Sequence, residues 1–162
     1  MTDESLAQGP AAGVGSSALR RDFGTKEDVF VEAMGMPFRP SEVLDSVLAG
    51  GRATRGERIV RLLLGLYEDP AALDAMRGLI REAVSREEVA LMMREFIGQE
   101  LVKRMAAAID KPDPELRASL VGSQMAGLAM LRYVLRVEPL ASADPEAIVA
   151  LVAPNVQRYL TG

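Results

Sequence analysis

The sequence predicts an all-α protein, and three observations carry this prediction. No segment alternates apolar and polar residues with the period of a β-strand, whereas apolar residues recur at helical spacing along most of the chain. Asp-Pro pairs, which typically start helices, occur three times, each ahead of one of the later apolar segments. Apolar residues make up 49% of the 162 residues and aromatics only 4%, which indicates helices packed mainly through aliphatic side chains and methionine.

The first part of the chain contains four predicted helices, at about 16–23, 26–34, 41–48 and 53–67. Gly24 suits the left-handed turn that ends the first of these helices. Thr25 and Asp28 have the spacing of a capping box, which starts the second helix. Gly35 follows the end of the second helix, and Gly50 follows the end of the third.

Four longer helices are predicted further along, at about 70–84, 86–109, 114–137 and 145–160. Asp69, Asp113 and Asp144 each precede a proline, so each Asp can accept backbone N–H bonds while the proline occupies the first turn. Ser85 and Glu88 have the spacing of a further capping box.

The last two predicted helices carry more apolar surface than a small monomer can cover. Between Arg117 and Arg136 the only charged residue is Arg132, and a helix that is apolar all round must be buried all round. Arg132 and Gln124 argue against a membrane span, and we expect no membrane partner. Two copies packed as a four-helix bundle would bury the surplus in a homodimer. The alternative is a central core helix within a monomer.

Two segments closely resemble the TetR family of transcriptional regulators, namely VGSSALRRDFGTKEDVF at 14–30 and GSQMAGLAMLRYVLRVEPLA at 122–141. The resemblance implies a helical bundle of the TetR regulatory-domain type, with a partial helix-turn-helix region at 1–36 and a ligand-binding and dimerisation domain at 37–162. It implies that the helix at 16–23 reads the major groove of operator DNA and that Lys26 grips a phosphate. The predicted DNA contacts are Ser16, Ser17, Arg20, Arg21 and Lys26.

The resemblance also implies a small inducer bound between the middle helices and a dimer formed by the last two. Flexible methionine side chains suit an adaptable apolar pocket, although ordinary core packing is the alternative for each residue. The predicted ligand-binding residues, for a small apolar ligand, are Tyr67, Met76, Ile80, Met92, Met93, Phe96 and Met125. The predicted dimer-interface residues are Val121, Gly122, Met125, Leu128, Ala129, Arg132, Ile148, Leu151, Val152 and Val156.

The composition argues against catalysis and metal binding. The chain contains no His and no Cys, which removes the commonest general base, the commonest metal ligand and the thiol nucleophile. We therefore expect no enzymatic activity, no cofactor and no metal. Residues 1–15 lack the basic start and apolar run of a signal peptide, so a cytoplasmic location is expected.

Two functions follow from these patterns. The first is a ligand-responsive, TetR-like repressor that acts as a homodimer. The second is a ligand-binding and dimerisation module that does not bind DNA because its helix-turn-helix is incomplete. Only thirteen residues precede Val14, and residues 1–51 contain four basic side chains against eight acidic ones, whereas DNA binding favours a positive surface.

Overall fold

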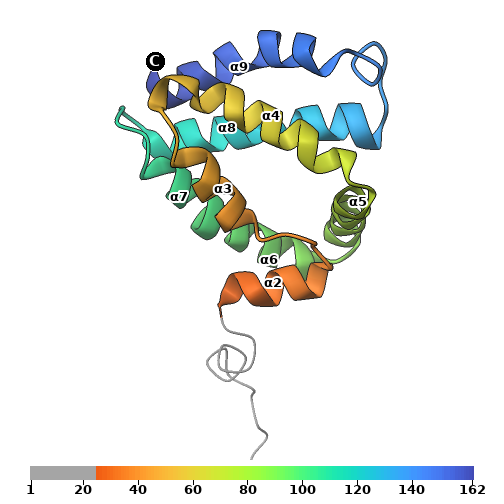
Figure 1. Ribbon diagram of the computed structural model, residues 1–162. Helices are drawn as coiled ribbons and strands as arrows, with labels where there is room; N and C mark the ends of the chain where they lie inside the picture. Colours follow the sequence, from red (N-terminus) through yellow and green to blue (C-terminus); the bar gives the residue numbers. More distant parts are fainter. Residues whose placement is uncertain (1–24) are drawn as a thin grey trace, which may run out of the picture.

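The computed structural model describes residues 25–162, and every regular element in that range is helical (Figure 1). This confirms the predicted all-α fold class. The predicted recognition helix at 16–23, with Ser16, Ser17, Arg20 and Arg21, lies outside the described residues. The helices are α2 (Lys26–Met34), α3 (Pro40–Leu48), α4 (Arg55–Glu68), α5 (Pro70–Ser85), α6 (Glu87–Phe96), α7 (Lys103–Ala106), α8 (Pro114–Ala129) and α9 (Pro145–Thr161).

Short segments of other helix types extend three of these helices. A 3₁₀ turn at Arg52–Thr54 leads into α4. A π-helical segment at Ile97–Val102 joins α6 to α7. The predicted helix at 86–109 is therefore continuous across this junction, with π-helical hydrogen bonding in its middle. A second π-helical segment, Met130–Val134, continues α8. Such segments are uncommon and occur often at functional sites.

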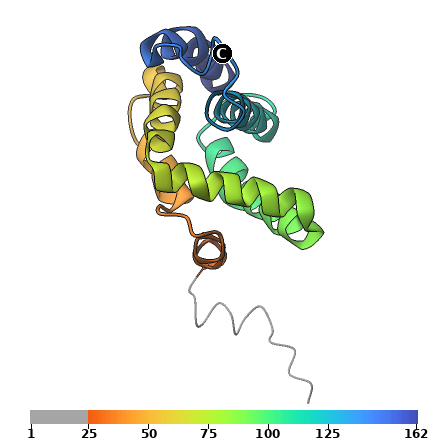
Figure 2. The same cartoon turned by 90° about the vertical axis from the view of Figure 1, so that its right-hand side faces the viewer.

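Helices α4, α8 and α9 form the main core. Figures 1 and 2 show α4 lying between α9 and the lower part of the molecule, with α8 beside it. Val60, Val121 and Val156, one from each of these helices, are fully buried. The amphipathic spacing of Ile59, Val60 and Leu64 turns one face of α4 inward. The core is therefore built from helices that are far apart in the sequence.

Helix α2 lies at the end of the molecule opposite α9, against α5 and α6 (Figure 1). It ends at Gly35, whose φ of 60° is the left-handed conformation that favours glycine. Glu27 is buried with only 4% exposure, and its carboxylate accepts hydrogen bonds from the backbone N–H and the hydroxyl of Ser41. Arg39 pairs with Glu27 as well. The buried Glu27 carboxylate therefore links the start of α2 to the start of α3 through hydrogen bonds.

Three of the predicted caps are confirmed. The Thr25 N–H donates to the Asp28 carboxylate at 2.7 Å, and the Asp28 N–H donates to the Thr25 hydroxyl at 3.2 Å, which completes the capping box. Asp69 accepts from the N–H of Ala71 and Asp144 from the N–H of Glu146, both at 3.0 Å.

Two predicted caps are wrong. Asp113 has a φ of 55°, in the left-handed region, and its side chain makes no capping hydrogen bond. Ser85 belongs to the last turn of α5, where its hydroxyl donates to the carbonyl of Arg81 at 2.8 Å. Arg86 takes the N-cap position of α6 instead, without a side-chain cap.

Candidate functional site

Lys26 is the one predicted DNA contact that falls within the described residues. It is the first residue of α2, held there by the Thr25 capping box, and its side chain is 56% exposed. Its ammonium lies 2.6 Å from a carboxylate oxygen of Glu95 on α6. The hydrogen bond and the positive charge of Lys26 lower the pKa of Glu95 below its usual value. A predicted phosphate-binding lysine is therefore paired with an acid of the same chain.

An aromatic contact lies beside this ion pair. Phe30 of α2 and Phe96 of α6 stack with ring centroids 4.2 Å apart and planes 9° apart, and both are buried. Phe96 was predicted to bind ligand, but its ring packs at the junction of α2 and α6. Phe96 therefore contributes to the contact between α2 and α6, and its use by a ligand stays a prediction.

The other predicted ligand-binding residues lie in three places. Met125 belongs to the main core with 9% exposure. Tyr67 packs near Tyr133, with ring centroids 5.8 Å apart, and burial raises the pKa of its phenol. The remaining residues are partly buried side chains of α5 and α6, namely Met76, Ile80, Met92 and Met93.

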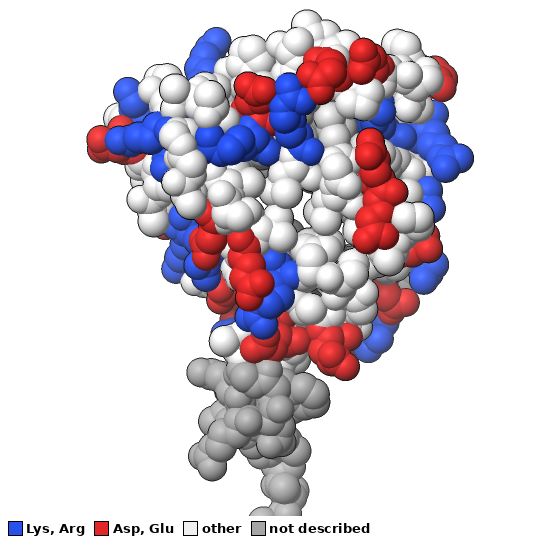
Figure 3. Space-filling model, viewed as in Figure 1, with Lys and Arg blue, Asp and Glu red and all other residues white. Residues whose placement is uncertain are grey.

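These helices border a hollow on the face shown in Figure 3. The hollow lies within the ring formed by α3, α4, α5 and α6 in Figure 1, its edges are uncharged, and acidic side chains flank it on both sides. The partly buried methionines come from the helices of that ring. Their use by a ligand stays a prediction.

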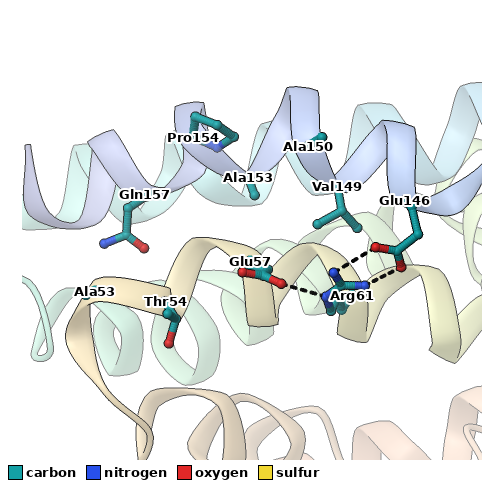
Figure 4. A pocket seen from close by; sticks show the side chains of 10 residues that line it. All are labelled: Ala53, Thr54, Glu57, Arg61, Glu146, Val149, Ala150, Ala153, Pro154 and Gln157. Atoms are coloured by element: carbon teal, nitrogen blue, oxygen red, sulfur yellow. Dashed lines mark hydrogen bonds and ion pairs between the residues drawn. The ribbon is translucent and has the colours of Figure 1, made fainter.

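A groove of about 400 Å³ that the sequence analysis did not predict lies between α4 and α9 (Figure 4). Arg61 crosses it, donating to Glu57 at 2.9 Å and to the two oxygens of Glu146 at 2.5 and 2.9 Å. The Arg61 guanidinium lowers the pKa of Glu146. The spacing of Glu57 and Arg61 is a helical ion-pair signal, but the partner on α9 has no local signal in the sequence. Because Glu57 and Glu146 both engage Arg61, the described residues that line this groove include no unpaired cation.

Six of the ten predicted interface residues are buried within the chain itself: Val121, Met125, Leu128, Ala129, Ile148 and Val156. Arg132 points to its own chain as well, since it donates to the carbonyls of Leu140 at 2.6 Å and Ala143 at 2.9 Å. Gly122 and Leu151 are exposed, and Val152 is partly buried. The six buried residues thus belong to the core of this chain, and the dimer interface stays a prediction.

Other apolar side chains are exposed on the same helices. Leu116, Leu120 and Leu131, with exposures of 60, 37 and 42%, follow one face of α8 and its continuation. Leu151 on α9 is 76% exposed. Helical periodicity in the sequence identified α8 and α9 as apolar helices. It did not show which face of each helix would be covered by another helix of the same chain.

Two negative findings concern residues 25–162. No group of acidic side chains in that range is arranged to hold a metal ion. None of the helices in it has the length and apolar character to cross a membrane.

Helices account for every regular element of residues 25–162, so the chain belongs to the class of all-α proteins. The chain belongs to the TetR family: its residues 53–160 match the family described as "Tetracyclin repressor-like, C-terminal domain". A crystal structure of a TetR-family regulator from Streptomyces coelicolor A3 is similar, with 33% sequence identity, 90% of this chain and 99% of that chain covered, and a TM-score of 0.62. A comparison with the curated proteins found no match. The chain is thus a transcriptional regulator, and regulators of this family are generally not enzymes.

Proposed function

We propose that this chain is a ligand-responsive repressor that acts as a homodimer, with DNA contacted at the α2 end and a small apolar ligand bound among the middle helices. The observation that carries the proposal is the placement of Lys26. The capping box puts this lysine at the first position of α2, exposed at one end of the molecule. A lysine there can reach a phosphate, and a phosphate contact fixes the orientation of a protein on DNA.

Dimerisation is supported by the exposed side chains of α8 and α9. Leu116, Leu120 and Leu131 lie on one face of α8, and solvent-exposed leucines on one face favour a helical partner. Gly127 falls on this face, and a Cβ built there would meet nothing within 4 Å. A helix of a second copy could therefore approach α8 closely, with Leu151 of α9 at the same contact.

Ligand binding is supported by partly buried apolar side chains of α5 and α6, two of the helices around the hollow of Figure 3. Met76 and Ile80 on α5, with Met92 and Met93 on α6, are neither fully buried nor fully exposed. Methionines in such a position adapt to apolar molecules of different shape. Tyr67 contributes an aromatic face and a phenol, and burial raises the pKa of that phenol above its ordinary value.

The test is fluorescence anisotropy of labelled DNA from just upstream of the gene, titrated with the chain at about 50 and about 200 mM salt. Contacts to several phosphates lose orders of magnitude in affinity over that range. We expect sequence-selective binding that weakens steeply with salt. A folded dimer that binds no DNA at either salt concentration would instead identify a ligand-binding and dimerisation module without DNA-binding activity.

A further inference from the structure

The pairing of Lys26 with Glu95 bears directly on how this lysine meets DNA. The two side chains are 56% and 59% exposed, so neither is trapped by burial. The Nζ to Oε1 distance of 2.6 Å is nevertheless that of a close, charge-assisted hydrogen bond. Of the acids on α2, Glu27 and Asp28 are engaged by Arg39. Within the described residues, Glu95 is the acid that pairs with Lys26.

The neighbouring aromatic stack holds the pair in register. Phe30 follows Lys26 by one helical turn, and Phe96 follows Glu95 directly. The buried stack of Phe30 on Phe96 fixes α2 against α6 at this point. With the two helices held together there, the ammonium and the carboxylate remain within reach of each other, so the pair can re-form after each separation.

A DNA phosphate needs the same ammonium that Glu95 now holds. The carboxylate cancels the charge of Lys26, and it would also repel an approaching phosphate. We propose that Glu95 competes with DNA phosphate for Lys26, so that the lysine contacts DNA only when the α6 carboxylate releases it. This inference rests on the proposed function, in which Lys26 is a phosphate contact. It adds a residue of the sensor domain that weakens DNA binding in the absence of any ligand.

The first experiment compares Glu95→Gln with the wild-type chain in the anisotropy titration. Glutamine keeps the size of the side chain but removes the competing charge. We expect tighter binding, by up to about fivefold per subunit, the upper end for an exposed pair. The affinity should also fall more steeply with salt, by about one unit of the log–log slope per freed lysine, since a freed cation displaces one more counterion.

Glu87→Gln is the matched control, because Glu87 is an exposed acid of the same helix without an ion pair among the described residues. It removes the same charge from α6 and measures the effect of net charge alone. In a Lys26→Gln background, Glu95→Gln should have no effect beyond that of the control. If Glu95→Gln and Glu87→Gln raised the DNA affinity equally, the proposed competition between Glu95 and phosphate would be overturned. Weaker binding of Glu95→Gln would overturn it too, because Glu95 would then orient Lys26 toward DNA.

A second experiment needs no DNA. Lys26, Lys103 and Lys111 are the three lysines of the chain, and the latter two are exposed and form no ion pair within residues 25–162. Brief acetylation with an N-hydroxysuccinimide ester, read by mass spectrometry, reports how often each amine is free. Glu95→Gln should raise the rate at Lys26 several-fold and leave the other two unchanged. An unchanged Lys26 rate would overturn the pairing, even if the chain binds DNA. Faster acetylation with no DNA binding by either protein would overturn the proposed function and, with it, the competition.

Discussion

Gly56 of α4 lies directly against Gln157 of α9. The backbone N–H of Gly56 donates to the side-chain oxygen of Gln157 at 2.8 Å. A Cβ added at Gly56 would lie 2.6 Å from the Gln157 nitrogen and 2.7 Å from the Ala153 carbonyl oxygen. Both are backbone atoms, which cannot rotate away. The absence of a side chain at this one position therefore sets how closely α4 and α9 pack.

Gly56→Ala should destabilise the protein, although alanine is the better helix former. The added methyl forces α4 and α9 apart, and overpacking of this kind costs about 1–3 kcal/mol. Urea unfolding followed by circular dichroism would measure the change in the free energy of unfolding.

Gly65→Ala is the matched control for that substitution. Gly65 lies on the same helix, is exposed, and would place its Cβ in open space. Here only helix propensity acts, so Gly65→Ala should raise the free energy of unfolding by up to about 1 kcal/mol. If both alanines stabilise the protein, the close approach at Gly56 is not a constraint in solution.

Local chemistry in the sequence was enough to predict most helix ends. Asp69 and Asp144 cap their helices because an extended backbone at the Asp lets the carboxylate reach back to the first turn. Asp113 has the same sequence signal, but its backbone is left-handed, and that conformation depends on how the preceding loop returns to α8. A dipeptide signal cannot report a backbone angle that the tertiary path decides.

The candidate sites were less predictable than the helices. The apolar spacing of Val121, Met125 and Leu128 correctly marks a buried face, but α4 and other helices of the same chain cover that face. Periodicity gives the direction of burial and not the identity of the neighbour. The Lys26–Glu95 pair joins residues 69 positions apart, so no local pattern could have shown it.

Arg132 should stabilise the connection between α8 and α9 and play no part in dimerisation. It donates to the carbonyls of Leu140 and Ala143, so Arg132→Met leaves two partly buried acceptors without their donor. Arg132→Met should lower the free energy of unfolding, measured with urea, by about 1–3 kcal/mol. Arg81→Met is the control, since the Arg81 side chain is exposed and makes no ion pair within residues 25–162. Sedimentation of Arg132→Met as a monomer under folded conditions would contradict the assignment.

Leu151→Glu should break the proposed dimer without unfolding the subunit. Leu151 is 76% exposed in the single chain, so its replacement leaves the core intact, but it would put two like charges into a contact between copies. Val84→Glu, at the 84% exposed end of α5, is the control for adding a charge to an exposed aliphatic position. Sedimentation equilibrium should show a dimer for wild type and Val84→Glu and a monomer for Leu151→Glu. A dimeric Leu151→Glu would move the interface away from this part of α9.

Asp28 should make the stability of the protein depend on pH on the acid side. The backbone N–H of Thr25, then its hydroxyl and Arg39, bond to the carboxylate and lower the pKa of Asp28 in the folded state. A folded pKa below the unfolded one adds stability that is complete above the unfolded value, near 3.9, and is lost as the pH falls through the folded value. The advantage of the wild type over Asp28→Asn should thus be greatest at neutral pH and shrink below about pH 4 in urea unfolding. An advantage that stays constant from neutral to acidic pH would mean that the capping box works without the charge of Asp28.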